Sequence, residues 1–343
     1  MTEPLRLRVP APAAVELPAD ADGVVWRPAT ADDIDAIVEL EAAIAEVDHP
    51  RYTAPREDVA ENFEQSHTDP GRDTLVAAAD GRVVAWGVVE LSPVQDTLVR
   101  CYLFGGVHPQ ARGRGIGRTL LAWQESRGLE LLATSDAELP GWLMVYADGG
   151  AVTAQRLVER TGYEAARYFL DLRRDLAQPV PDRPMPEGVR LEPLTEDLWD
   201  ATWQARNEAF LDHWGSQPVN EEKWLTFMRR ESFRPQWSHV ALGLNADGGW
   251  EVAAFVLAQA NEQDWPLQGF TSTYIDLVGT RRAWRGKGLA SALLVATMRA
   301  AAADGMQRAI LDVDADSPTG ALGLYTGLGF AEDARSMAYV KTF

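Results

Sequence analysis

The chain has 343 residues, 46% of them hydrophobic and 24% charged, and its 32 Lys and Arg against 51 Asp and Glu leave a net charge of −19. This length and composition predict about two globular domains, each large enough to bury its own core. The negative balance disfavours a general affinity for nucleic-acid phosphates and suits a cationic substrate, although most of the charge is expected to be solvated surface.

Several classes of protein are excluded by what the sequence lacks. Cys101 is the only cysteine, which excludes an internal disulfide and a thiolate metal cluster, and its apolar flanks predict a strand residue. The five histidines show no metal-ligand spacing, so no metal is expected. No apolar run approaches the roughly 18 residues that cross a bilayer, and the first residues lack signal-peptide features. We therefore expect a cytoplasmic protein with no membrane or nucleic-acid partner.

The sequence contains an ordered internal repeat. Three segments of the first half recur in the same order in the second half, at nearly constant offsets: 24–30 with 189–195, 112–117 with 285–290, and 157–163 with 324–330. A unit of this length is too long for a solenoid repeat and is expected to be a domain. Residues 178–188 carry four prolines and read as an extended linker. The expected organisation is a loose leading arm (1–21), a first domain (22–177), the linker and a second domain (189–343).

Each copy alternates strands and helices in the same order. In the first copy, apolar runs on both sides of Asp80-Gly81 predict a hairpin over 74–88, and its counterpart spans 240–257. A strand follows in each copy (99–107; 273–280), then a glycine-rich loop and a helix. A further strand (142–146; 309–313), a short helix and a closing strand complete the unit. The expected fold is α/β with a mixed sheet, built twice.

The two glycine-rich loops read Arg-Gly-Arg-Gly-Ile-Gly (112–117) and Arg-Gly-Lys-Gly-Leu-Ala (285–290). Glycine lets the backbone turn sharply and approach a ligand closely, and amides at a helix N-terminus favour an anion. Neither loop has the residues of a Walker A loop or the spacing of a dinucleotide fingerprint. Taken alone, each loop predicts either a phosphate site or a tight strand-to-helix turn.

In this context the loops resemble those of the GNAT superfamily of acyl-CoA N-acyltransferases, whose pattern is Gln/Arg-x-x-Gly-x-Gly/Ala. The chain meets this pattern twice, at Arg112, Gly115 and Gly117 and at Arg285, Gly288 and Ala290. Residues 324–330 are similar to the late helix of the family. The resemblance runs from about residue 22 onward, and the tandem arrangement is similar to that of mycothiol synthase-like acyltransferases.

The resemblance implies acetyl-CoA as the acyl donor, with its diphosphate on the loop amides and its pantetheine arm along the preceding strand. The residues carried over in the second copy are Val278, Thr280, Arg285, Gly286, Lys287, Gly288, Leu289, Ala290 and Ser317. Those in the first copy are Val107, Arg112, Gly113, Arg114, Gly115, Ile116 and Gly117. Ser317 departs from the family, which often carries an asparagine before the late helix.

The resemblance also implies which copy is catalytic. Tyr325 occupies the position of the family's tyrosine acid, and Asp276 lies on the strand that carries its base. The first copy has Val158 at the position of Tyr325 and no carboxylate on the matching strand, so the second copy is expected to catalyse direct acyl transfer in a ternary complex. The first copy is then a coenzyme A-binding or scaffold domain. Alternatively, Tyr325 is an ordinary helix tyrosine, Asp276 a structural charge, and the chain a coenzyme A-binding sensor or structural module without turnover.

The acceptor is expected to be a small amine held early in the second copy, and the negative charge of the chain suits a cationic one. Residues 207–215 gather Asp212, His213 and Trp214, and strand alternation places Tyr274 with Asp276 and Val278 on one face. The structural alternative is that Asp212 and His213 close a helix while Trp214 fills an interface. The sequence leaves the acceptor and the choice between monomer and homodimer open.

Overall fold

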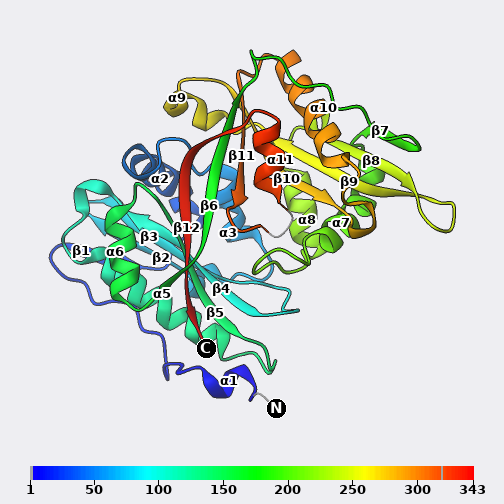
Figure 1. The fold of residues 1–343 in the computed structure, drawn as a ribbon. Coiled ribbons are helices and arrows are strands. Elements are labelled where there is room, and N and C mark those ends of the chain that lie inside the picture. Colours follow the sequence, from blue (N-terminus) through cyan, green and yellow to red (C-terminus); the bar gives the residue numbers. More distant parts are fainter. Residues whose placement is uncertain (1–2, 318–319) are drawn as a thin grey trace. The chain divides into compact units, whose positions relative to one another are not determined.

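The structure is a computed structural model that describes residues 3–317 and 320–343. The chain divides into two compact units (Figure 1). Unit 1 comprises residues 1–168 and 336–343, and unit 2 comprises residues 169–335. Each unit is an α/β domain with a mixed sheet, which confirms the expected fold class.

Unit 1 has a sheet in the order β1-β2-β3-β4-β5-β12, antiparallel except for the parallel pair β4–β5. Its strands are β1 (Val24–Arg27), β2 (Thr74–Ala79), β3 (Arg82–Leu91), β4 (Val99–Val107), β5 (Gly141–Asp148) and the end of β12 (Ala331–Thr342). Its helices are α1 (Leu5–Arg8), α2 (Ile34–Asp48), α3 (Arg56–Glu64), α4 (Pro70–Asp73), α5 (Ile116–Leu132) and α6 (Val152–Arg160).

Unit 2 repeats this plan with the order β6-β11-β10-β9-β8-β7, and β10–β11 is its parallel pair. Its strands are the end of β6 (Glu164–Asp175), β7 (Val189–Pro193), β8 (His239–Leu244), β9 (Trp250–Gln259), β10 (Ser272–Thr280) and β11 (Arg308–Asp314). Its helices are α7 (Trp199–Ala209), α8 (Glu221–Met228), α9 (Trp265–Gln268), α10 (Leu289–Ala303) and α11 (Ala321–Gly327).

The predicted strands are confirmed in both copies, including both hairpins. At the turn between β2 and β3, Asp80 and Gly81 have φ values of 49° and 74°. These positive values are what a two-residue hairpin turn matching the strand twist requires. Cys101 lies fully buried in β4, as the apolar flanks predicted.

The two closing strands, β6 and β12, each extend into the other unit, which differs from the expected domain bounds. Residues 336–342 of β12 pair with β5 and belong to unit 1, whereas residues 169–175 of β6 pair with β11 and belong to unit 2. Local pattern identifies a closing strand but does not select its partner, because both copies offer an equivalent sheet edge. Residues 179–186, within the predicted linker, form neither helix nor strand.

The leading arm is docked on unit 1. Leu5 is fully buried, and Arg8 donates hydrogen bonds to the carbonyls of Leu139 and Phe343. The arm was expected to be loose because its proline-rich composition carries no periodicity. Its anchoring comes from contacts with residues more than 100 positions away.

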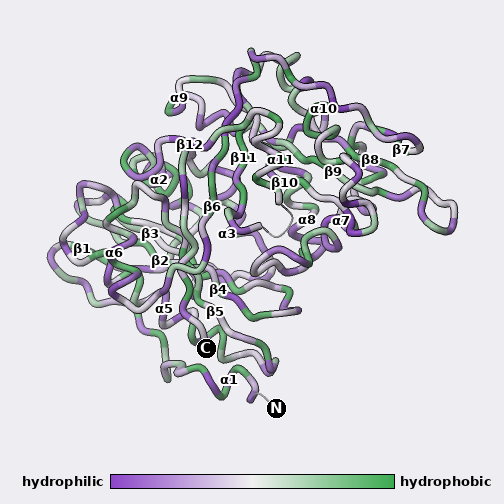
Figure 2. The backbone as a smooth tube through the Cα atoms, viewed as in Figure 1, coloured by the Kyte–Doolittle hydropathy of each residue, from purple (hydrophilic) through white to green (hydrophobic). Residues whose placement is uncertain are grey.

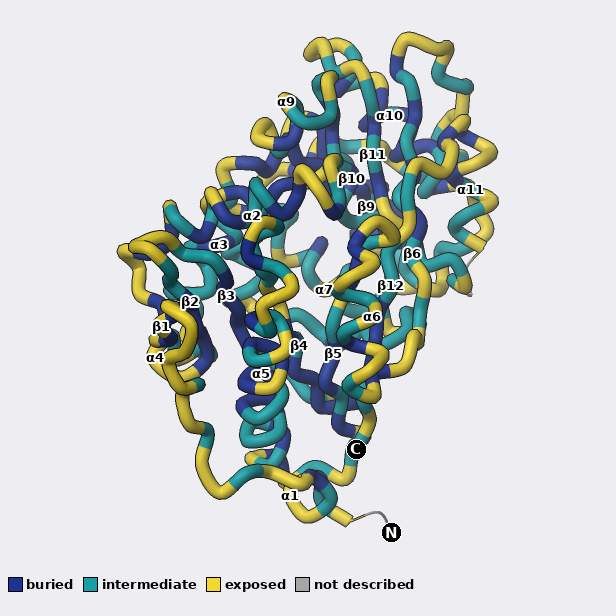
Figure 3. The backbone as a smooth tube through the Cα atoms, turned by 90° about the vertical axis from the view of Figure 1, so that its left-hand side faces the viewer, coloured by how far each residue is buried: buried dark blue, intermediate teal, exposed yellow. Residues whose placement is uncertain are grey.

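Both faces of each sheet are covered. In β9, Ala254 and Val256 join the core beneath α10, whereas Phe255 and Leu257 join the core beneath α7 and α8. This explains the continuous apolar run of the strand. Figure 2 shows the hydrophobic stretches along such central strands, and Figure 3 shows them as buried. No helix in the part of the chain that the structure describes is long and apolar enough to cross a membrane.

The parallel strand pair of each unit opens part-way along its length. The β10–β11 register covers Ser272–Tyr274 against Arg308–Ile310, and the β4–β5 register covers Val99–Tyr102 against Gly141–Met144. Both partners continue for several residues beyond these pairs. The diverging strands leave a wedge in each sheet, and a glycine-rich loop follows the strand that forms one side of it.

We expect Tyr339→Ala to destabilise unit 1 selectively. Tyr339 is 1% exposed in the core of unit 1, and its hydroxyl bonds Glu159. Losing a buried aromatic ring costs about 3 kcal/mol. Hydrogen exchange should therefore quicken in β5 but not in β9, while Thr342→Ala, an exposed position of the same strand, leaves both unchanged. Equal acceleration in β9 would contradict the assignment of the last strand to unit 1.

Candidate functional site

The loop of unit 2 presents backbone amides rather than side chains. Gly286 and Gly288 have φ values of 75° and 81°, and Gly288 is the N-cap of the fifteen-residue helix α10. A Cβ atom placed on either glycine would meet nothing within 4 Å, so the surface above the loop is open. Leu289 points into the core and is 1% exposed. An open, amide-lined turn at a long helix N-terminus fits the diphosphate of coenzyme A.

The cationic side chains of this loop are engaged within the protein. Arg285 donates through Nε to the Thr280 carbonyl, through Nη1 to Asp212 at 2.6 Å, and through Nη2 to the Ala209 carbonyl. The Lys287 ammonium lies 4.4 Å from the centre of the Trp284 ring. Arg285 therefore fixes the conformation of the loop. Because its side chain is already paired, the groups of the loop that remain available to an anion are backbone amides.

The same arrangement recurs in unit 1. Arg112 donates through Nε to the Val107 carbonyl and through both terminal nitrogens to Asp48 at 2.8 Å. Gly113 and Gly115 have φ values of 81° and 87°. Arg114 donates to the Asp22 carbonyl, and Ile116 is buried in the core.

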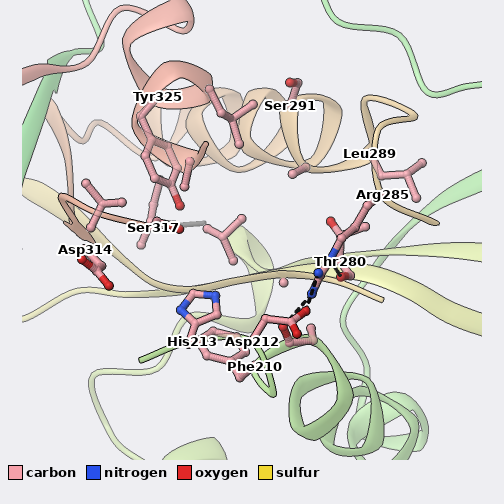
Figure 4. A pocket seen from close by; sticks show the side chains of 18 of the residues that line it. Phe210, Asp212, His213, Thr280, Arg285, Leu289, Ser291, Asp314, Ser317 and Tyr325 are labelled. Atoms are coloured by element: carbon pink, nitrogen blue, oxygen red, sulfur yellow. Dashed lines mark hydrogen bonds and ion pairs between the residues drawn. The ribbon is translucent and has the colours of Figure 1, made fainter. Parts of the chain in front are cut away.

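One cavity of about 890 Å³ in unit 2 joins the loop to the predicted catalytic residues. Its lining includes Arg285, Gly286, Gly288, Leu289 and Ala290 of the loop, Asp276, Val278 and Thr280 of β10, and Ser317 and Tyr325. Figure 4 shows the Tyr325 side chain pointing from α11 into this cavity. Burial, followed by the nearby charge of Asp312, raises the pKa of Tyr325. The phenol is therefore protonated at neutral pH.

Asp276 occupies a β-bulge. The β9–β10 register shifts between Ile275 and Leu277, and Gln259 donates to Asp276 Oδ2 at 2.6 Å. Ile275 before the bulge and Val278 after it share the core beneath α10, whereas Leu277 packs against the core beneath α7 and α8. The strict alternation expected for this strand is therefore wrong, because one inserted residue reverses the faces.

Tyr274 consequently lies apart from Val278. Its hydroxyl donates to Asp312 on β11, and among the described residues it is not part of the cavity lining. Desolvation, followed by the charges of Asp312 and Asp276, raises the pKa of Tyr274. Tyr274 thus orients the carboxylate of Asp312, which does line the cavity.

The acceptor segment predicted after α7 contributes two of its three named residues to the cavity, Asp212 and His213. His213 stacks on Phe210 with ring centres 4.5 Å apart. Burial is the main cause that lowers the pKa of His213, so its imidazole is neutral at pH 7. Arg285 and Arg282 both donate to Asp212, which lowers the pKa of that carboxyl. Trp214 is not among the described lining residues.

The lining residues that the sequence prediction missed include Phe210, Asp312 and Asp314. The alternation of Asp312 and Asp314 along β11 is a usable signal, since it places two carboxylates on one side of a strand next to the wedge. With Asp276 they bring three carboxyl groups to the cavity lining, and burial raises the pKa of the Asp312 carboxyl. No group of three or more His, Cys, Asp or Glu suited to a metal ion occurs among residues 3–317 and 320–343.

Unit 1 has a cavity of about 810 Å³ at the equivalent place. Its lining includes Val107, Arg112, Gly113, Gly115 and Gly117. Val158 of α6, 3% exposed, lines it where unit 2 has Tyr325. Burial raises the pKa of Glu41, which also lines this cavity and accepts from the Trp86 indole. The two units thus share a loop and a cavity but differ in the residue on the late helix.

Comparison with known proteins places both units in one family. Residues 199–330 match the family model described as "Acetyltransferase (GNAT) family", and residues 70–165 match "Acetyltransferase (GNAT) domain". The chain is 30% identical to a mycothiol acetyltransferase of Nocardioides sp., over 68% of this chain and 78% of that protein. It is 27% identical to a mycothiol acetyltransferase of Streptomyces coelicolor, over 91% and 96% of the two chains.

Solved structures support the same family assignment. A GCN5-related N-acetyltransferase from Sphaerobacter thermophilus superposes with a TM-score of 0.70 and 28% identity, covering 94% of this chain and 97% of that one. A tandem GNAT protein from the clavulanic acid biosynthesis pathway shares the fold, with a TM-score of 0.64, 17% identity, and coverage of 93% and 98%. With the glycine loops and cavities described above, these matches show that the chain is an N-acetyltransferase and belongs to the acetyltransferase (GNAT) family, with two such domains in tandem.

Proposed function

We propose that unit 2 transfers the acetyl group of acetyl-CoA to the amine of a small molecule, by direct attack while both substrates are bound. The observation that carries this proposal is the single cavity lined both by the glycine loop and by Tyr325. Unit 1 has Val158 at the matching position, and we assign to it coenzyme A binding without turnover.

The donor is held by main-chain groups. The amides of residues 286–290 bind the diphosphate at the N-terminus of α10. Beyond Tyr274, β10 is no longer in register with β11, so residues 276–280 offer backbone groups to the amides of the pantetheine arm. Acetyl-CoA, when bound, supplies the thioester carbonyl that the amine attacks.

Two side chains handle protons. The raised pKa of Tyr325 keeps its phenol protonated, so it can donate to the departing thiolate. An alkyl amine with a pKa of about 10 must lose a proton before it attacks. Asp276, held by Gln259 at the bulge, is the base we assign to that step, directly or through a water.

The acceptor is a small amine that enters on the acidic side of the cavity. Asp276, Asp312 and Asp314 line this side and favour an ammonium group, while His213 and Phe210 supply a flat apolar wall. Curated relatives are named mycothiol acetyltransferases, so the amine acceptor of those enzymes is the first compound to test in a screen that follows thiol release.

The loops provide a matched pair of variants that identify the active unit. Gly288 and Gly115 are both left-handed N-caps of a long helix, and aspartate tolerates that conformation better than most residues. A carboxylate placed against the diphosphate costs several kcal/mol, so Gly288→Asp should raise the KM for acetyl-CoA by at least about tenfold. Gly115→Asp should remove one of two calorimetric coenzyme A sites and leave turnover unchanged. Loss of turnover in Gly115→Asp alone would assign catalysis to unit 1.

Tyr325→Phe should lower kcat by about 100-fold with little change in the KM for acetyl-CoA, because it removes only the proton donor. Tyr163→Phe is the matched control, since Tyr163 is the buried tyrosine that follows the late helix of unit 1. Its hydroxyl has no hydrogen-bond partner among the described residues. Initial rates of thiol release measure both variants, and an unchanged kcat in Tyr325→Phe would rule out the acid role.

Asp276→Asn should lower kcat/KM by about 100-fold near pH 7, because the amide still accepts from Gln259 but takes up no proton. The defect should shrink toward about pH 10, where the free amine forms without a base. Asp304→Asn, at a carboxylate that accepts from the Trp237 indole, is the control. A defect independent of pH would mean that Asp276 binds the acceptor and does not deprotonate it.

A further inference from the structure

The end of α7 is tied to the donor loop by several charged contacts. Arg285 donates to Asp212 Oδ2 at 2.6 Å, and Arg282 donates to the other oxygen at 2.5 Å. Arg281 donates to Glu208 at 2.9 Å. Both carboxylate oxygens of Asp212 are therefore paired with guanidinium groups that flank or begin the glycine loop.

Arg285 joins two separate segments of the chain. It bonds the Thr280 carbonyl at the end of β10, the Ala209 carbonyl at the end of α7, and the Asp212 side chain. A planar guanidinium holds its partners in a fixed relative geometry. Any change in the position of the loop is thus passed to residues 209–213 by hydrogen bonds.

Comparison with unit 1 separates the contacts that both units share from those found in unit 2. There, Arg112 and Asp48 form the equivalent pair, and Arg112 bonds the Val107 carbonyl. At an offset of 173, the places of Arg281 and Arg282 are taken by His108 and Pro109. The second and third arginines are a feature of unit 2, the unit to which we assign catalysis.

The segment held by these arginines forms the acceptor wall. His213 directly follows Asp212 and stacks on Phe210, and all three line the cavity with the loop (Figure 4). The Asp212 carboxylate therefore connects the donor loop of the cavity to its acceptor wall.

We propose that Asp212 is a positioning residue that transmits occupancy of the donor loop to the acceptor wall, Phe210 and His213. This inference rests on the proposed function of unit 2. When the loop amides are fixed by the diphosphate, Arg281, Arg282 and Arg285 are fixed with them, and the segment 209–213 becomes ordered. The amine then meets a preorganised wall only when the donor is in place.

Hydrogen exchange with coenzyme A as the probe tests this inference without an acceptor. In the wild-type protein, coenzyme A should slow exchange at residues 286–290 and also at 209–213. In Asp212→Asn, protection at 286–290 should persist, whereas the protection gained at 209–213 should fall by about tenfold, because a neutral amide forms weaker bonds to the two arginines. Asp212→Glu, which restores the charge, should recover part of it.

Asp48→Asn is the matched control, because it removes the same charge from the equivalent pair of unit 1. It should leave the response at 209–213 intact. Arg285→Lys offers a second route to the same result, since lysine keeps the charge but loses the planar fork.

Two results would overturn the inference, and they are distinguishable. Full protection of 209–213 in both Asp212→Asn and Arg285→Lys would show that donor binding reaches the acceptor wall without Asp212. A wild-type protein in which coenzyme A leaves 286–290 unprotected would overturn the proposed donor site, and this inference with it.

Discussion

The geometry of unit 2 depends on the short length over which its two parallel strands are paired. β10 and β11 are in register only from Ser272 to Tyr274 and then separate. The separated edge of β10, the bulge at Asp276 and the open turn at Gly286 and Gly288 all lie along the resulting wedge. A strand pair that continued in register would fill the cavity with backbone hydrogen bonds and leave no edge for a ligand.

The two units share a common frame but carry different side chains on it. Both have the wedge, the left-handed glycines and the arginine–aspartate pair. The side chains on that frame differ, among them Val158 in unit 1 and Tyr325 in unit 2. The difference in function that we propose for the two units therefore rests on side chains placed on a scaffold that both copies retain.

The two ends of the unit 2 cavity differ in their electrostatic character. A chain with a net charge of −19 is a poor general host for a polyphosphate, and the arginine of its loop is already paired with Asp212. Backbone amides at the start of α10 can nevertheless attract an anion, because the positive end of a helix favours negative charge without a free cationic side chain. At the other end, Asp276, Asp312 and Asp314 line the cavity where we propose that the amine acceptor binds.

Short-range patterns in the chain were enough to predict the duplication and the strand and loop positions, because glycine spacing, hairpin turns and apolar periodicity are encoded locally. The resemblance of the loops and the late helix to the GNAT family implied the placement of Tyr325 and Asp276 beside the loop. Other features arise only when distant segments meet: the pairing of β12 with β5, the bulge that turns Tyr274 away from Val278, and the contact of Arg285 with Asp212 across 73 positions. Each depends on which sheet edge or carboxylate is nearest after folding, and equivalent partners exist in both copies. Three-dimensional packing therefore selects among alternatives that look the same along the chain.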